Sequence, residues 1–133
     1  MITPAETPYA LRVVRVADMS ECWQVRAMLD SGEVVASVKM RTLTECSCVG
    51  VVFHLETRTE YRRQGMAYAM LAELESTARR ENVSLLVLTV RMDNLPCRAL
   101  IRKAGFYEVC AWNNGRTGNN LVLGRKVLRL ASE

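Results

Sequence analysis

The hexapeptide Arg62-Arg63-Gln64-Gly65-Met66-Ala67 separates a strand-like run from a helix-like run. Residues 49–57, before it, alternate in polarity with the period of two that is typical of a β-strand. The expected faces of this strand carry Val49, Val51, Phe53 and Leu55 on one side and Val52, His54 and Glu56 on the other. Residues 65–81, after it, repeat apolar side chains at intervals of three and four, which predicts an amphipathic helix.

The hexapeptide has the features of an anion-binding turn. The first N–H groups of a helix have no partner within the helix, and the positive end of the helix dipole lies at the same place. Gly65 lets a ligand approach the backbone, Ala67 keeps the next turn narrow, and Arg62 and Arg63 add positive charge. The same residues also suit a solvated basic loop before an ordinary helix, and the hexapeptide alone does not separate the two interpretations.

A second strand and a second helix follow. Residues 85–90 are a mostly apolar run of strand length, and residues 95–104 have the pattern of a short helix. Pro96 lies in the first turn of this helix, and Gly105 follows its end as the left-handed cap. A right-handed crossover through the first helix would place the two strands side by side and parallel. Two final antiparallel strands are expected at residues 106–112 and 121–130.

These residues resemble the GCN5-related N-acetyltransferase (GNAT) superfamily. Its Arg/Gln-x-x-Gly-x-Gly/Ala pattern is matched by Arg62, Gly65 and Ala67, and Asn94 and the segment Ala99-Leu100-Ile101-Arg102-Lys103-Ala104-Gly105-Phe106 follow as in the family. The resemblance extends over roughly residues 30–110. It implies an α/β fold in which a mixed, mostly antiparallel sheet holds a central parallel strand pair and has flanking helices.

Length and composition are those of one globular domain. The 133 residues are enough to bury a core, so residues 1–133 are expected to form a single GNAT-like domain with residues 1–7 flexible. No apolar run reaches the roughly 18 residues that a membrane span needs, and the first residues lack the pattern of a signal peptide. The expected location is cytoplasmic, without a membrane partner.

Cysteines and charge indicate little beyond the coenzyme site. Five cysteines, an odd number, are expected to be reduced thiols. The spacing Cys46-x-Cys48 hints at a pair of metal ligands, but a chain with one histidine can hardly assemble four, so no metal is expected. The net charge of +4 permits a nucleic-acid partner without indicating one, since Arg58, Arg62 and Arg63 already cluster at the proposed phosphate turn.

The N-terminal third has two interpretations. Residues 9–16 predict a first strand, and residues 22–29 and 34–41 alternate in polarity around Asp30-Ser31-Gly32, which predicts a β-hairpin. The rival is a helix over residues 19–29 with a capping box. We favour the hairpin, because the alternation and the tight turn agree. GNAT proteins usually place one or two helices between their first two strands, where they wall the acceptor pocket. The hairpin therefore implies a short or missing first helical region and an open acceptor site.

The resemblance implies a site for acetyl-CoA as co-substrate. The pantetheine arm would pair, like an added strand, with the strand that ends near Thr57, on the side of the strand that begins near Leu85. The pyrophosphate would rest on the N–H groups of residues 63–68. The expected cofactor-binding residues are Leu55, Thr57, Arg62, Arg63, Gln64, Gly65, Met66, Ala67, Tyr68 and Asn94. Capping of the second helix is an equally good interpretation of Asn94.

Acyl transfer to an amine needs a neutral amine, a donor for the developing oxyanion and a proton for the departing thiolate. A backbone N–H within residues 55–57 is the expected oxyanion donor. His54 and Glu56 are the candidate bases, near the place where family members often carry an acidic residue or a histidine; a structural or solvent-facing position is the alternative. The tyrosine that many family members use as acid falls at Ile101, and a glutamate of some relatives falls at Thr89.

The expected function is transfer of an acetyl group from acetyl-CoA to an unidentified primary amine, by direct attack in a ternary complex. Ile101 and Thr89 leave open a non-catalytic acyl-CoA-binding module. The open acceptor side and the basic surface leave open an amine carried by a protein or a nucleic acid. The chain is expected to act as a monomer or a homodimer.

Overall fold

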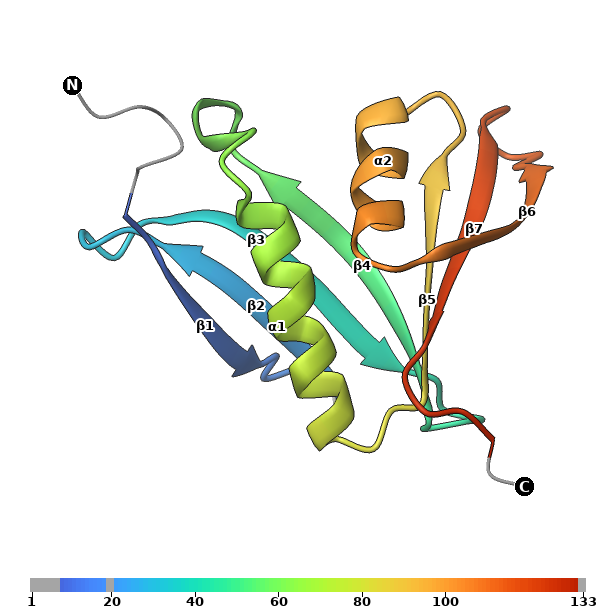
Figure 1. Cartoon of the computed structure of the whole chain (residues 1–133), viewed down its shortest axis with the longest axis horizontal. Coiled ribbons are helices and arrows are strands. Elements are labelled where there is room, and N and C mark those ends of the chain that lie inside the picture. The colour runs from blue at the N-terminus through green and yellow to red at the C-terminus, as the bar shows by residue number, and fades with distance from the viewer. Residues whose placement is uncertain (1–7, 19–20, 132–133) are drawn as a thin grey trace.

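The computed structural model describes residues 8–18 and 21–131; the flexible segment expected at residues 1–7 lies outside them. Figure 1 shows a twisted sheet with two helices in front of it. The described strands form one seven-stranded sheet in the order β1-β2-β3-β4-β5-β7-β6, antiparallel throughout except for the parallel pair β4 and β5. This confirms the expected mixed α/β fold. The elements are β1 (Ala10–Arg15), β2 (Cys22–Met28), β3 (Val34–Thr42), β4 (Val49–Thr57), the 3-10 helix η2 (Thr59–Tyr61), α1 (Met66–Arg80), β5 (Leu85–Arg91), α2 (Leu95–Lys103), β6 (Tyr107–Asn113) and β7 (Asn120–Val127).

The N-terminal third forms the predicted hairpin of β2 and β3, and the alternative of a helix over residues 19–29 is wrong. Trp23, Val25 and Ala27 are all buried, so the period of two places one face of β2 in the core. Gly32 has a φ of 88° in the turn, a conformation that glycine adopts without steric strain. Among the described residues, no helix lies between β1 and β2. This agrees with the expectation that the first helical region is short or missing.

Both helices lie on one face of the sheet (Figure 1) and share its hydrophobic core. Met70 and Leu74 of α1 are fully buried in this core. Ile101 of α2 is buried in the same core. It lies close to β7: a Cβ added at Gly124 would be 3.4 Å from the Ile101 Cδ1 and 3.2 Å from the Leu88 Cδ1. The opposite side carries no helix in the described part of the chain. We call it the uncovered face; strand alternation gives it Arg12, Arg26, Lys39, Arg41, Val51, Phe53, Glu56, Val87 and Leu123.

Strand β4 has the predicted bounds but not the predicted faces. Its pairing with β3 slips between Phe53 and Glu56, and His54 at the slip has a φ of 52°. One extra residue in a strand forms a β-bulge and shifts the phase of every side chain beyond it. Leu55 therefore packs against the same core as Val52, although strict alternation placed them on opposite faces. The expected face shared by Val52, His54 and Glu56 is wrong for this reason.

The two parallel strands are hydrogen-bonded only at their beginnings. Val49–Val51 pairs with Leu85–Val87, and no register connects the strands beyond Val51. β5 continues instead along β7, up to the pair Arg91 and Leu121. The C-terminal halves of β4 and β5 therefore part, as Figure 1 shows. The backbone of β4 is left without a strand partner on the β5 side, which is the arrangement that an extended ligand needs.

The last two strands differ from the prediction only at their ends. β7 stops at Val127 rather than at residue 130, because Leu128 turns inward and is buried, with its N–H donating to the Ser84 carbonyl at 2.8 Å.

Among the described residues, no helix combines the length and the apolar character that crossing a bilayer requires.

Candidate functional site: an anion-binding turn beside two parting strands

The turn before α1 leaves the start of that helix open. Gly65 is the N-cap residue, with φ 79° and ψ 3°, and no side chain of the described residues caps the helix. A Cβ at Gly65 would meet no atom within 4 Å, so the space beside the N-cap residue is open. Arg63 is also left-handed, with a φ of 63°. Alternating backbone conformations that turn N–H groups to one side form concave anion sites, and the positive end of the helix dipole adds to the attraction.

Arg62 and Gln64 connect this turn to its surroundings. The Arg62 Nε donates to the carbonyl of Thr57, the last residue of β4, at 3.0 Å. The Gln64 Nε2 donates a long hydrogen bond of 3.5 Å to the Glu60 carbonyl. The Gln64 Oε1 is buried, and it is the one buried side-chain polar atom of the described residues without a partner. A buried acceptor without a donor is unfavourable.

The three residues that begin α1 contribute in different ways. Met66 is buried in the core, so only its backbone N–H is available to a ligand. Ala67 is half-buried, and its small side chain leaves the turn accessible. Tyr68 is 40% exposed, and the Lys103 ammonium lies 4.9 Å from the centre of its ring. This cation–π contact brings a second positive charge, from the end of α2, near the start of α1.

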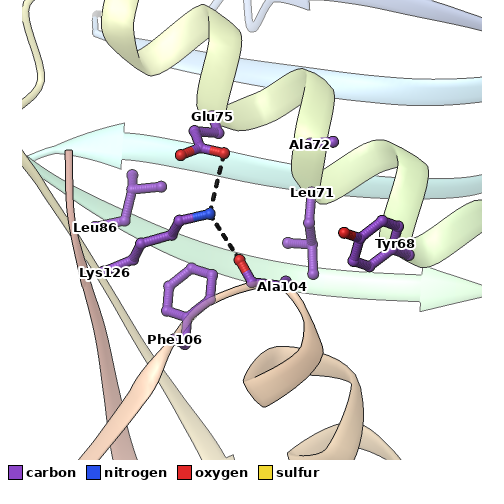
Figure 2. Close-up of a pocket in the computed structure, with 8 residues that line it drawn as sticks. All are labelled: Tyr68, Leu71, Ala72, Glu75, Leu86, Ala104, Phe106 and Lys126. Carbon is purple, nitrogen blue, oxygen red and sulfur yellow. Dashed lines mark hydrogen bonds and ion pairs between the residues drawn. The ribbon is translucent and has the colours of Figure 1, made fainter.

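A small cavity lies beside Tyr68, between α1, the end of α2 and β7 (Figure 2). The Lys126 Nζ crosses it and donates to Glu75 Oε2 at 3.0 Å and to the Ala104 carbonyl at 2.7 Å. Burial tends to raise the pKa of Glu75, but hydrogen bonds and charges from Lys126 and Arg79 outweigh it, and the net pKa is lowered. With a volume of about 40 Å³, the cavity has room for water and not for a cofactor. We assign a structural role to this place, where the contacts of Lys126 hold the two helices together.

The end of β4 positions backbone groups rather than side chains. Leu55 packs against the core, and Thr57 is half-buried and uses its carbonyl to accept from Arg62. Beyond Val51, the N–H groups of β4 on the β5 side have no strand to pair with. The structure thus places the phosphate turn and the unpaired backbone at the same end of β4, and these are the two parts expected to hold an acyl-CoA.

The two candidate bases are both exposed. His54 lies at the bulge, with its ring edge against Phe53 and 4.8 Å between ring centres. Glu56 is opposite Ser37 on the uncovered face and forms no ion pair with a described residue. Because of the bulge, the two side chains no longer follow one alternating face of β4. The structure therefore does not join them into one catalytic pair.

The residues in and beside α2 that the sequence singled out make contacts within the chain. The Asn94 Oδ1 accepts the Cys97 N–H at 3.2 Å and so caps α2. Ile101, at the family's tyrosine position, is 1% exposed and cannot donate a proton. Cys97, which is near it in sequence, packs against the core, and burial raises the pKa of its thiol. Tyr107 is exposed, with the Arg125 guanidinium 5.3 Å from the centre of its ring.

A larger hollow was not anticipated from the sequence. It has a volume of about 280 Å³, lies where β5 ends against the β6–β7 loop, and is lined by Arg91, Met92, Asp93, Gly118, Asn119 and Asn120. The Arg91 guanidinium is paired with the Asp93 carboxylate at 2.9 Å. These residues come from two segments that only the fold brings together. The one local signal was the set of polar residues directly after β5.

The Cys46-x-Cys48 pair lies in the β3–β4 loop, with the two Sγ atoms 3.1 Å apart and both residues exposed. Within residues 8–18 and 21–131, no group of three or more His, Cys, Asp or Glu side chains is arranged to hold a metal ion.

Comparison with known proteins agrees with this fold. The model of the acetyltransferase (GNAT) family matches residues 4–106. No curated protein sequence is similar enough to count as a match. Solved structures show the same fold at low sequence identity.

The ribosomal-protein-S18-alanine N-acetyltransferase from Escherichia coli has a TM-score of 0.73 at 18% identity, over 87% of this chain and 75% of that one. An acetyltransferase of the GNAT family from Streptococcus pneumoniae has 0.75 at 20% identity, over 85% and 70%. The ribosomal-protein-alanine N-acetyltransferase from Brucella melitensis has 0.70 at 22% identity, over 80% and 69%. With a family model that matches most of the chain, and solved structures that share its fold, the chain belongs to the acetyltransferase (GNAT) family and is an N-acetyltransferase of that type.

Proposed function

We propose that the protein transfers an acetyl group from acetyl-CoA to a primary amine by direct attack in a ternary complex. The open helix start at Gly65 carries this proposal, because it lies at the same end of β4 as the unpaired backbone beyond Val51. An extended ligand with a pyrophosphate at one end and amides along its length fits both features.

The residues that hold acetyl-CoA are then assigned by position. Arg62, Arg63 and the N–H groups from Gly65 to Tyr68 bind the pyrophosphate, while the backbone of residues 55–57 binds the pantetheine arm. When bound, acetyl-CoA supplies an activated thioester carbonyl. A β4 N–H beside that carbonyl stabilises the developing oxyanion, and alignment of the amine with the carbonyl supplies much of the rate.

A proton must leave the attacking amine. We assign this to His54 or Glu56, directly or through water, since both are exposed near the end of β4. Histidine has an ordinary pKa near 6.5 and suits a base at neutral pH. Ile101 occupies the family's tyrosine position in the core and cannot donate a proton, so we assign protonation of the departing thiolate to solvent. Slow turnover relative to a tyrosine-containing relative is the expected consequence.

The test is calorimetric binding of acetyl-CoA followed by an amine screen that detects free CoA thiol. Micromolar binding and amine-dependent thiol release support the proposal. His54→Ala should lower kcat, whereas Glu56→Gln should leave kcat close to that of the native chain if His54 is the base. Binding without turnover across the screen would instead support the second candidate, an acyl-CoA-binding module, which the buried Ile101 favours.

A further inference from the structure

The centre of the uncovered face is apolar. Val51 of β4, Val87 of β5 and Leu123 of β7 lie on it, and all three are only half-buried. All-parallel sheets almost always have both faces covered by other elements, and their strands are apolar on both sides. The pair β4 and β5 has that two-sided apolar character, yet the described part of the chain covers one side only. The composition of these strands therefore predicts a second layer that this chain does not supply within its described residues.

The flank of the same face is basic. Arg12 of β1 lies directly opposite Arg26 of β2, and Lys39 and Arg41 of β3 continue the cluster. None of the four is within 4.0 Å of a carboxylate in the described residues. Glu56 is the single acidic residue that alternation places among them, and Asp18 lies near the Arg41 end. Like charges directly opposite on neighbouring strands are destabilising, so this arrangement favours an anionic partner.

We propose that the uncovered face binds an acidic, amphipathic polypeptide segment, whose apolar side covers Val51, Val87 and Leu123 and whose carboxylates meet the basic cluster of β1 to β3. The proposal does not depend on acetyl transfer. Charge disfavours a second copy of this chain, because two such faces would bring basic residues against basic residues in a protein of net charge +4. Val51, Val87 and Leu123 favour a polypeptide, because its apolar side chains can cover all three, whereas the bases of a single-stranded nucleic acid would stack on Phe53, Tyr107 and Trp112 of the same face.

The experiment uses fluorescence anisotropy with a labelled synthetic helical peptide that carries leucines on one side and glutamates on the other. Its counterpart with lysines in place of the glutamates and a labelled oligouridylate are the comparison probes. We expect micromolar binding of the acidic peptide to the full chain and at least tenfold weaker binding of the other two probes. Arg12→Glu/Arg26→Glu should weaken binding of the acidic peptide at least tenfold, and Val87→Thr should weaken it severalfold without a change of fold.

The matched control is Arg80→Glu/Arg116→Glu, which makes the same change of net charge away from the uncovered face. The affinity of this control for the acidic peptide should stay within about twofold of that of the native chain, because its lower net charge weakens only the screened long-range attraction. Equal loss in both double variants would mean that net charge alone attracts the peptide, and it would overturn the proposal. Tighter binding of the oligouridylate, a homodimer dispersed by Val87→Thr, or no binding of the acidic peptide to a folded native chain would also overturn it. Circular dichroism of each variant verifies that it is folded.

Discussion

The two helices follow similar strands, but their first turns differ. α1 begins at Gly65, which offers no side chain, has φ 79° and faces open space. α2 begins at Asn94, whose Oδ1 accepts the Cys97 N–H, and Pro96 removes another unpaired donor. Arg98 then fixes the turn, because its Nη1 donates to the Met92 carbonyl at 2.8 Å.

The difference shows how a chain separates a binding helix from a structural one. Every helix start has unpaired N–H groups, and they must find partners. Where side chains of the chain itself satisfy them, as at Asn94, the helix is stabilised and offers little to a ligand. Where the cap is a glycine with free space above it, as at Gly65, the partners have to come from outside. Four experiments test whether this contrast is real.

The largest effect is expected at the open helix start. Gly65→Asp places a carboxylate where the pyrophosphate should lie and removes the residue that tolerates a φ of 79°. Affinity for acetyl-CoA should fall by at least about 100-fold, which corresponds to about 2.7 kcal/mol. Calorimetry on the purified variant measures it.

Gly32→Asp is the matched control for that variant. Gly32 also has a positive φ, 88°, and a Cβ there also meets no atom within 4 Å, but it lies in the β2–β3 turn. The control bears similar backbone strain and the same added charge, so it should bind acetyl-CoA like the native chain. Equal weakening by both substitutions would show that strain or net charge, not the helix start, governs affinity.

The contrast also requires that α1 and α2 keep their relative positions, which Lys126 helps to fix. Lys126→Met should lower the free energy of unfolding by about 1–3 kcal/mol, because the Ala104 carbonyl loses its donor Lys126 and the half-buried Glu75 carboxylate keeps only the bond from Arg79. Chemical denaturation measures this. The double variant Lys126→Met/Glu75→Gln, which also removes the half-buried carboxylate that has lost one of its two cationic partners, should recover part of the loss. A loss unaffected by the second substitution would show that Lys126 acts through packing alone.

The capped helix start separates two interpretations of Asn94. Asn94→Ala should lower stability by about 1 kcal/mol, the usual effect of losing an N-cap. Asn94→Asp should retain stability, since aspartate caps equally well. Affinity for acetyl-CoA should stay within about threefold in both variants if the role is structural only. A folded and stable Asn94→Asp variant with clearly weaker binding would show instead that the amide touches the cofactor.

The smallest effect concerns pH at the start of α2. The hydrogen bonds from the Arg98 guanidinium to Glu108, together with the charges of Arg98 and Arg102, lower the pKa of Glu108 below its ordinary value of 4.5. A carboxyl with a depressed pKa stabilises the fold above its unfolded pKa, and this stabilisation is lost as the pH falls through the folded pKa. The melting temperature of Glu108→Gln should therefore be lower than that of the native chain at pH 7 and converge with it well below pH 4.5. A constant difference at all pH values would rule out this ion pair as the cause.

Much of the fold followed from local rules. Gly65, Asn94 and Gly105 mark helix ends through backbone conformation and hydrogen bonds that involve only nearby residues, so the sequence was enough to place α1 and α2 within a residue or two. The β2–β3 hairpin was predictable for the same reason. The position of the phosphate turn followed from a motif. Its binding role stays a prediction.

The rest depended on contacts between distant segments. The bulge at His54 arises from the register of β4 against β3, and nothing in the polarity of residues 49–57 indicated the extra residue. The faces of His54 and Glu56 could not be assigned without it. The hollow at Asp93 needs the β6–β7 loop, which reaches β5 only because β7 inserts between β5 and β6. The unpaired Gln64 Oε1 depends on burial, which the local sequence does not reveal.

The hydrogen bond from Arg62 to the Thr57 carbonyl gives the site one more property. Arg62 belongs to the turn proposed to bind the pyrophosphate and Thr57 to the end of β4 proposed to bind the pantetheine arm, so one guanidinium joins the two proposed parts of the site. A ligand that engages both parts is a chelate, in which attachment of one end orders the groups that receive the other. Pantetheine alone or an adenosine diphosphate alone would engage only one of the two parts, and would therefore not benefit from groups ordered by binding at the other part. The protein should therefore discriminate strongly against fragments and free nucleotides, which are abundant competitors of any acyl-CoA.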